Sequence, residues 1–260
     1  MKIDYSLFDP SGNVTALVQT DVDKKLYAEI SKEILKIEPS AQQVGFVENG
    51  NLYMSGGEFC GNASASLACL KLKNSCEDPK NIKAYSFEVS GAGETVKTAV
   101  KKISENEFTA SVDMPIFKEI VYKDFDIGFD KLNLPAIKIP GIYHIIISQN
   151  LEKSLAEKLI KMWCNELNAD ALGLMFFDEQ RAFLKPLVYV KAVDTLYWES
   201  SCASGTAALG FYISKKYEKK VSLNISEDGG TLTVDAAPSG KVRLTGNVRF
   251  IGNKEFIFNE

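Results

Sequence analysis

The sequence is poor in the residues that most metal sites and disulfide frameworks need. Histidine occurs once, and cysteine occurs five times, at positions 60, 69, 76, 164 and 202. An odd number of cysteines argues against a disulfide framework, and the close C-x2–4-C pairs typical of zinc sites are missing. We therefore expect no metal site. We also expect a cytoplasmic protein, because the sequence shows neither a signal-peptide core nor a membrane span.

Charge of one sign and long apolar runs are absent too. The 260 residues include 30 basic and 34 acidic side chains, mixed along the chain, for a net charge of −4. Such a mixture offers no basic field to nucleic acid or to an anionic membrane. The N-terminal "MKIDYSLFDP" has no apolar core of signal-peptide length, and no window approaches the roughly 18 apolar residues of a membrane span. We expect a small-molecule partner.

The chain contains two similar halves. An extended run at 13–18 precedes a helical pattern at 23–37, and a run at 143–148 precedes another helical pattern at 151–167. A strand with a glycine at a matching place follows each helix, and each half closes with a turn-rich pattern typical of antiparallel hairpins. The halves predict an α+β fold of two domains of like topology, related by a pseudo-twofold, with the active site in the cleft between them.

The domain boundary is expected near the middle of the chain. We assign residues 1–117 to an N-terminal domain and 118–260 to a C-terminal domain, and leave open whether the last strand returns to the N-terminal domain. The second half carries an insertion of 14 residues, because Gly45 precedes Cys60 by 15 positions whereas Gly173 precedes Cys202 by 29.

Two cysteines open look-alike helices at matching places of the repeat. They lie in "GGEFCGNASASLACL" (56–70) and "YWESSCASGTAALGF" (197–211). A helix N-terminus leaves N–H groups unpaired and favours an anion, so we expect each thiolate to be stabilised and its pKa lowered toward neutrality. Gly61 and Ala203, which follow the cysteines, are small enough to let a ligand approach the backbone amides.

Facing thiols of this kind suit the inversion of a stereocentre. A substrate carboxylate can accept N–H bonds from both helix starts while one thiolate removes the α-proton and the opposite thiol donates to the other face. We therefore assign catalysis to Cys60 and Cys202. Cys69, Cys76 and Cys164 lack the paired context, and we expect them to be inert, buried thiols.

With these residues in place, the sequence resembles the diaminopimelate epimerase-like superfamily of cofactor-independent amino-acid racemases over essentially its whole length. The likeness is carried by "SGNVTALV", "QQVGFVE", "GGEFCGNASA", "SSCASGTAA" and "GGTLTVDA…VRLTGNV". It implies that each domain is a curved, mostly antiparallel sheet around a central helix, and that no cofactor is used. It also implies substrate-binding roles for Asn13, Gln43, Gly61–Asn62 and Ala203–Ser204. The alternative for Asn13 is that it is a turn residue.

Departures from the diaminopimelate epimerases indicate another substrate. Val193-Asp194 stands where those enzymes carry a Glu-Arg pair, so the guanidinium that grips a distal carboxylate is missing. The remaining motifs are most similar to the histidine racemases, some of which feed opine-type metallophore synthesis. We therefore predict a histidine racemase. An alternative is a racemase or epimerase of another amino acid, of the proline, hydroxyproline or diaminopimelate type. A second is a non-catalytic, thiol-containing amino-acid-binding protein. A homodimer is left open.

An imidazole would suit a pocket with aromatic walls and a carboxylate. Candidate wall residues are Tyr53, Phe59, Tyr197 and Trp198. Glu58 and Glu199, which closely precede the two cysteines, either accept the side-chain N–H or remain solvated acids that complement the helix dipoles. The single histidine, His144, lies in an apolar run, so we expect a hydrogen-bonded structural residue rather than a base.

Overall fold

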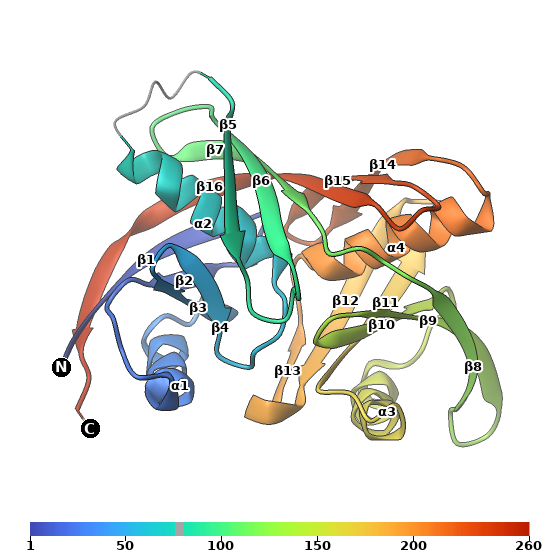
Figure 1. Ribbon diagram of the computed structural model, residues 1–260. Coiled ribbons are helices and arrows are strands. Elements are labelled where there is room, and N and C mark those ends of the chain that lie inside the picture. Colours follow the sequence, from blue (N-terminus) through green and yellow to red (C-terminus); the bar gives the residue numbers. More distant parts are fainter. Residues whose placement is uncertain (76–80, 260) are drawn as a thin grey trace.

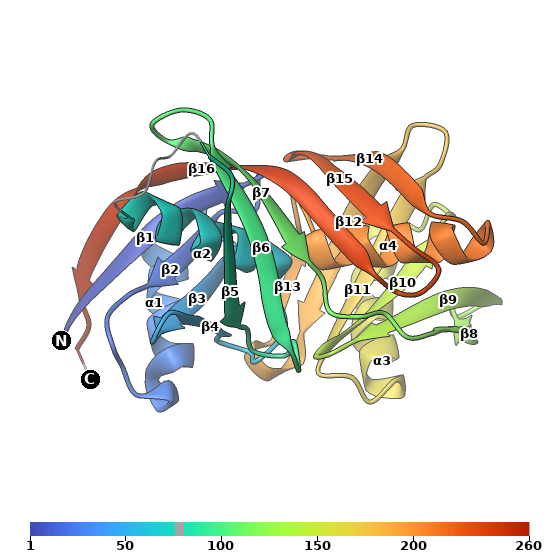
Figure 2. The ribbon, with the colours of Figure 1, turned by 45° about the horizontal axis from the view of Figure 1, so that its top comes forward.

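The computed structural model describes residues 1–75 and 81–259, and its two halves have a similar order of elements, with additional strands in the second half (Figures 1 and 2). The first half contains β1 (Lys2–Pro10), β2 (Thr15–Val18), η1 (Lys24–Leu26), α1 (Tyr27–Ile37), β3 (Gln43–Glu48), β4 (Asn51–Met54), α2 (Gly61–Asn74), β5 (Lys83–Glu88), β6 (Thr95–Lys102) and β7 (Glu107–Asp113). The second half contains β8 (Ile120–Asp126), β9 (Lys131–Ile139), β10 (Ile142–Ile147), α3 (Lys153–Glu166), β11 (Ala171–Asp178), β12 (Phe183–Val190), η2 (Lys191–Val193), β13 (Thr195–Trp198), α4 (Ala203–Lys216), β14 (Val221–Glu227), β15 (Gly230–Ala236) and β16 (Val242–Ile257). Cys76 lies outside the described residues.

Each half begins with a strand–helix–strand unit on a mixed sheet. In the first half β2 runs parallel to β3, with α1 as the crossover, and in the second half β10 runs parallel to β11, with α3 as the crossover. Both helices are amphipathic, and they bury apolar side chains such as Ile30 and Leu159 against the sheet. The two helical patterns read from the sequence are thereby confirmed.

The matching glycines make room for a side chain of the neighbouring strand. Gly45 pairs with Leu17, and Gly173 pairs with His144. A Cβ on Gly45 would lie 2.8 Å from Leu52 Cδ1, and a Cβ on Gly173 would lie 2.4 Å from His144 Nδ1. Both distances are shorter than real Cβ contacts, so a larger residue at either position would force the neighbouring side chain to shift.

The cysteine helices α2 and α4 run through the middle of the molecule (Figure 1). Most of their residues are buried, and neither helix has a polar face, which is the pattern of a helix enclosed on all sides. Helix α2 packs on β6 and β7, and α4 packs on β14 and β15. Small residues such as Gly210, whose added Cβ would lie 2.4 Å from Val234 Cγ2, allow the close approach of helix and sheet.

The closing segments form the antiparallel hairpins that the sequence predicts. Strands β5, β6 and β7 pair in order, and so do β14, β15 and β16. The long β16 pairs with β15 and also with β7 and β1, so the last strand joins both halves. The α+β class is confirmed, whereas the division at residues 117 and 118 stays a prediction. Among the helices of the described residues, none combines the length and the apolar character that a membrane crossing needs.

The 14 inserted residues of the second half fall in two places. Met54 pairs with Gly45, and Val188 pairs with Gly173, which makes Met54 and Val188 counterparts. The hairpin between β11 and β12 is longer than that between β3 and β4. The rest of the insertion, η2 and β13, follows β12 and has no counterpart in the first half.

Candidate active site

The starts of α2 and α4 meet across the interface between the halves. A Cβ on Gly61 would lie 2.9 Å from the Cβ of Ala203. Asn13 and Asn62 both donate from Nδ2 to the carbonyl of Ser201, at 2.7 and 3.2 Å. The residue before Cys202 is thus held by two amides of the first half, which brings the two cysteines to one place.

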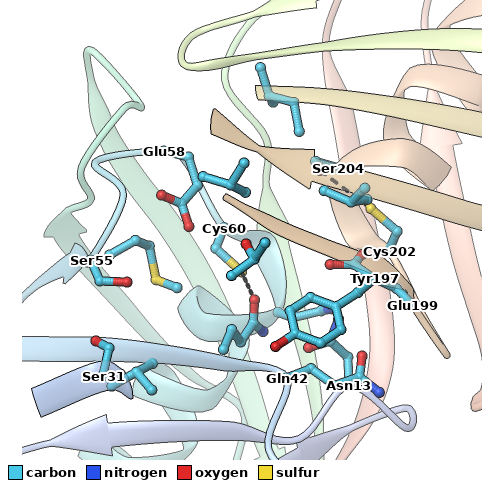
Figure 3. A pocket seen from close by; sticks show the side chains of 18 of the residues that line it. Asn13, Ser31, Gln42, Ser55, Glu58, Cys60, Tyr197, Glu199, Cys202 and Ser204 are labelled. Atoms are coloured by element: carbon cyan, nitrogen blue, oxygen red, sulfur yellow. Dashed lines mark hydrogen bonds between the residues drawn. The ribbon is translucent and has the colours of Figure 1, made fainter. Parts of the chain in front are cut away.

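Both cysteines open into one cavity of about 480 Å³ (Figure 3). All ten site residues predicted from the sequence lie in its lining, namely Asn13, Gln43, Glu58, Cys60, Gly61, Asn62, Glu199, Cys202, Ala203 and Ser204. Helix α1 adds residues that the sequence interpretation missed, Ala28, Ser31, Lys32 and Leu35. No local motif indicated them, because only the packing of α1 turns this face toward the cysteines. The roles of the ten residues stay predictions.

Cys60 is the N-cap of α2, and its sulfur is held by polar groups of the first half. Sγ accepts the Ala63 N–H at 3.3 Å, and the thiol donates to Gln43 Oε1 at 3.0 Å. Gln43 is itself fixed by donating from Nε2 to Thr15 Oγ1 at 2.6 Å. Burial raises the pKa of the Cys60 thiol to about 12, although the Ala63 amide acts in the opposite direction.

Cys202 is the N-cap of α4 and is only 4% exposed. Its sulfur accepts no capping amide hydrogen bond, and Ser204 Oγ lies 3.6 Å from it. Burial, followed by the charges of Glu199 and Glu227, raises the pKa of this thiol well above its ordinary value. The sequence predicted lowered thiol pKa values. The helix amides act in that direction, but burial and the neighbouring carboxylates outweigh them in the protein without substrate.

Glu227 is a buried carboxyl group at the start of α4 that the sequence interpretation missed. Its Oε2 accepts the Cys202 N–H at 2.6 Å, and its Oε1 accepts the hydroxyl of Thr206. Burial raises its pKa to about 8. Glu227 ends β14, 25 positions after Cys202, and only the hairpin packing of β14 on α4 brings it to the helix.

Glu58 and Glu199 are half-buried, and both side chains line the cavity. Burial raises the pKa of Glu58. Burial also raises the pKa of Glu199 to about 7, and the charge of Glu58 adds to the shift. Glu199 interacts with the Cys202 thiol and Asn13, while Glu58 Oε2 has no protein partner. Both groups line the cavity, and a substrate-binding role for them stays a prediction.

The aromatic walls are only partly as expected. Phe59 and Tyr197 line the cavity. Tyr53 lies instead beneath the Lys24 ammonium, 4.0 Å from its ring centroid, and Trp198 donates its indole N–H to Glu157 at 2.8 Å. Expecting both Tyr197 and Trp198 in the wall was wrong because neighbouring residues of a strand point to opposite faces.

His144 is fully buried in β10 and does not line the cavity. Its Nε2 lies 2.9 Å from Ser204 Oγ, and burial lowers its pKa to about 3, so the imidazole is neutral. The structure agrees with a hydrogen-bonded residue rather than a base. Cys69 and Cys164 are buried away from the cavity, and within the described residues no cluster of three or more His, Cys, Asp or Glu is arranged to hold a metal ion.

Comparison with known proteins defines the family. The family model described as "Histidine racemase CntK N-terminal domain" matches residues 2–253. The chain belongs to this family. A histidine racemase of Fusobacterium nucleatum is 37% identical over 237 residues, which cover 88% of each protein. A histidine racemase of Staphylococcus aureus is 30% identical over 247 residues, covering 89% of this chain and 88% of that protein. The resemblance drawn from the motifs is therefore confirmed.

The fold of this family member extends to more distant enzymes. A hydroxyproline epimerase of Agrobacterium vitis, solved with bound trans-4-hydroxy-L-proline, superimposes with a TM-score of 0.70 over 100% of this chain and 93% of that chain. The two sequences are only 11% identical, so the likeness concerns the fold alone. It confirms the two-domain, pseudo-symmetric architecture expected from the sequence.

Proposed function

We propose that the protein is a histidine racemase that inverts Cα by paired acid–base catalysis at Cys60 and Cys202. The observation that carries the proposal is the meeting of two N-cap cysteines, one from each half, in the lining of one cavity. Its membership of the histidine racemase family supports the substrate.

In the proposed reaction the substrate carboxylate binds between the two helix starts. Gly61 and Ala203 begin the two helices in the cavity lining, and the helix dipoles favour negative charge there. The N–H groups of the two helix starts stabilise the charge that spreads into the carboxylate as the α-proton leaves. One thiolate takes the proton from Cα, and the opposite thiol returns a proton to the other face. The two cysteines exchange roles for the other enantiomer.

The ammonium group of the substrate has partners in the same place. Asn13 lines the cavity and its Oδ1 is buried without a protein partner, and Glu199 lies beside both Asn13 and Cys202. A cation bound there offsets the carboxylates that disfavour a thiolate. Substrate binding is therefore expected to lower the thiol pKa values that burial raises in the protein alone.

A histidine side chain suits the far part of the cavity. Glu58 brings a carboxyl oxygen without a protein partner, and an imidazole N–H would satisfy it. Phe59 and Tyr197 supply aromatic surface. Lys32 is the one basic side chain in the described lining, and Asp194, at the place of the missing clamp, pairs with Lys161 at 2.9 Å outside it. This arrangement does not suit the distal carboxylate of diaminopimelate.

Deuterium exchange tests the proposal. Purified protein with reduced thiols is incubated with L-histidine in deuterium oxide, and α-proton loss is followed by NMR together with chiral separation of the product. We expect exchange and racemisation with histidine and much slower reaction with proline, trans-4-hydroxyproline and diaminopimelate. Faster exchange of another amino acid would overturn the substrate, and no exchange with any of them would overturn racemisation.

We also propose a partner, a compartment and an assembly for the enzyme. Free histidine is its small-molecule partner, and we place the reaction in the cytoplasm because both thiols must stay reduced to work. A homodimer is the assembly to be tested, and light scattering at micromolar concentration distinguishes it from a monomer.

A further inference from the structure

The two sulfur atoms are held by different kinds of group. Cys60 Sγ has a backbone amide and a glutamine side chain as partners, at 3.3 and 3.0 Å. Cys202 Sγ has a hydroxyl, Ser204 Oγ at 3.6 Å, and that hydroxyl lies 2.9 Å from the Nε2 of His144. Sulfur, hydroxyl and imidazole form an unbroken buried chain from the cavity wall into β10.

The two carboxyl groups that face Cys202 disfavour its thiolate. Glu199 approaches from the end of β13 and Glu227 from the end of β14, and both raise the pKa of the thiol beyond the effect of burial. The groups that act in the opposite direction are the Ser204 hydroxyl and the Gly205 amide. His144, from β10, faces Ser204 and is neutral.

We infer that Ser204 and His144 are a positioning pair for Cys202, in which the Ser204 hydroxyl donates to the sulfur when it is a thiolate and His144 orients that hydroxyl. The inference rests on the proposed function in so far as Cys202 is one of the two bases. It gives the Ser204 side chain a role distinct from that of its backbone amide, and it gives His144 a role without contact to substrate.

The surroundings of the imidazole determine which group donates in each hydrogen bond from His144 through Ser204 to Cys202. His144 Nδ1 is buried and has no partner, and the space beside it is kept open by Gly173. An unpaired lone pair is less unfavourable there than an orphaned N–H donor, so the proton belongs on Nε2. Nε2–H then donates to Ser204 Oγ, which leaves the hydroxyl hydrogen free to point at the sulfur.

The first half has no equivalent of this pair. Asn62 occupies the position of Ser204 in the helix register, and its side chain donates to the Ser201 carbonyl rather than to Cys60. Leu17, which pairs with Gly45, occupies the position of His144. The pair therefore belongs to Cys202 alone, and its removal is expected to affect only that cysteine.

Site-resolved alkylation tests the pair without any substrate. The full-length protein is treated with iodoacetamide between about pH 7 and 10, and the rates at Cys60 and Cys202 are measured by peptide mass spectrometry. A hydrogen bond to a charged group contributes about 1.5–3 kcal/mol, so Ser204→Ala is expected to slow Cys202 about tenfold or more at a given pH and to raise its apparent pKa by at least about one unit. Ser204→Thr, which keeps the hydroxyl, is expected to restore most of the rate.

The controls separate this effect from general disturbance. Ser214→Ala removes another buried hydroxyl of α4, one that donates to the Phe211 carbonyl at 2.8 Å, and is expected to leave both cysteines unchanged. His144→Leu copies the first half and is expected to slow Cys202 by less than Ser204→Ala. If Ser204→Ala does not fold, the alkylation rate of Cys202 in His144→Leu tests the inference instead.

Two outcomes overturn the inference. One is an unchanged or faster Cys202 in both Ser204→Ala and His144→Leu, and the other is an equal slowing of Cys60 and Cys202. Because alkylation needs no turnover, a failure here is distinguishable from failure of the histidine exchange assay.

Discussion

The two cysteine helices share a backbone frame but differ in the polar side chains around the sulfur. Cys60 and Cys202 are both N-caps, and in each case the N–H four residues on bonds to the cysteine carbonyl. Around Cys60 the contacts are uncharged, from Gln43 and Ala63. Around Cys202 they include a hydroxyl–imidazole chain and the buried carboxyl group of Glu227.

This difference shows what a repeated fold does and does not conserve. The repeat brings one thiol from each half to a single cavity, which the proposed two-base inversion requires. The substrate itself has no such symmetry, because its carboxylate, ammonium and side chain point in three directions. The second half adds β13, and with it Tyr197 and Glu199, so the pocket is built unequally from the two halves.

The largest expected effect tests whether the two thiols are equally necessary. Cys60→Ser and Cys202→Ser should each lower the rate of histidine racemisation by about 10³-fold or more, because the hydroxyl is a far weaker acid than the thiol and positioned acid–base catalysis contributes about 10²–10⁴-fold. Chiral chromatography from both enantiomers measures the rate. Cys69→Ala, in the buried middle of α2, should retain activity, and retention in either serine variant would contradict the two-base scheme.

The next effect concerns the contact between the helix starts. Gly61→Ala places a Cβ 2.9 Å from that of Ala203 and must push the two ends apart by a fraction of an ångström or more. Misplacement on the order of 1 Å costs about 10²-fold in rate, so kcat is expected to fall by up to that factor. Combining it with Ala203→Gly removes the clash and should recover activity. If the double variant is no better than Gly61→Ala, the contact is not the cause.

A smaller effect distinguishes the two cavity carboxyl groups. Glu58→Gln and Glu199→Gln are each expected to lower kcat/KM for histidine about tenfold or more, since each loses a charge-assisted hydrogen bond to substrate. Glu58→Gln is expected to change the pH dependence of Cys60 alone, whereas Glu199→Gln should change that of both thiols. The charge of Glu58 raises the pKa of Cys60, and that of Glu199 raises the pKa of both cysteines. Steady-state kinetics over pH measures both. Glu157→Gln, whose carboxylate bonds Trp198 outside the cavity, serves as the control, and equal pH profiles for the two variants would refute the division of roles.

The smallest expected effect is on stability and concerns Glu227, whose carboxyl group contacts the start of α4. The pKa of Glu227 is raised from 4.5 to about 8, so in that interval the folded protein holds a proton that the unfolded chain has released. Its contribution therefore makes the free energy of unfolding fall as pH rises from about 4.5 to about 8, by at most about 1.4 kcal/mol per pH unit. Glu227→Gln should flatten this slope.

Urea unfolding between about pH 5 and 9 checks this expectation. Glu88→Gln is the matched control, because Glu88 ends the corresponding strand β5 and is exposed. Equal slopes for the native protein and Glu227→Gln would show that this carboxyl group does not titrate in the folded state over this range.

The sequence predicted the helices that carry the site, because the residue patterns that specify a helix are local. The amphipathic spacing of residues 23–37 and 151–167 predicted the crossover helices, and the small residues after each cysteine predicted the enclosed helices. Comparing the halves located the two cysteines and the small residues that follow them, and the resemblance to the amino-acid racemases added Asn13 and Gln43. The aromatic wall was less predictable, because whether Tyr197 or Trp198 faces the cavity depends on how β13 pairs with β12.

The sequence by itself determined the two helix starts, the cysteine at each and the likeness to the amino-acid racemases. Only the tertiary structure decided how those starts meet at Gly61 and Ala203, why Asn13 reaches Ser201 across 188 positions, and which groups surround each sulfur. The physical reason is distance along the chain. A helix start is specified by its own neighbours, whereas the acidity of a thiol depends on burial and on side chains such as Glu227 and His144 that only packing brings near.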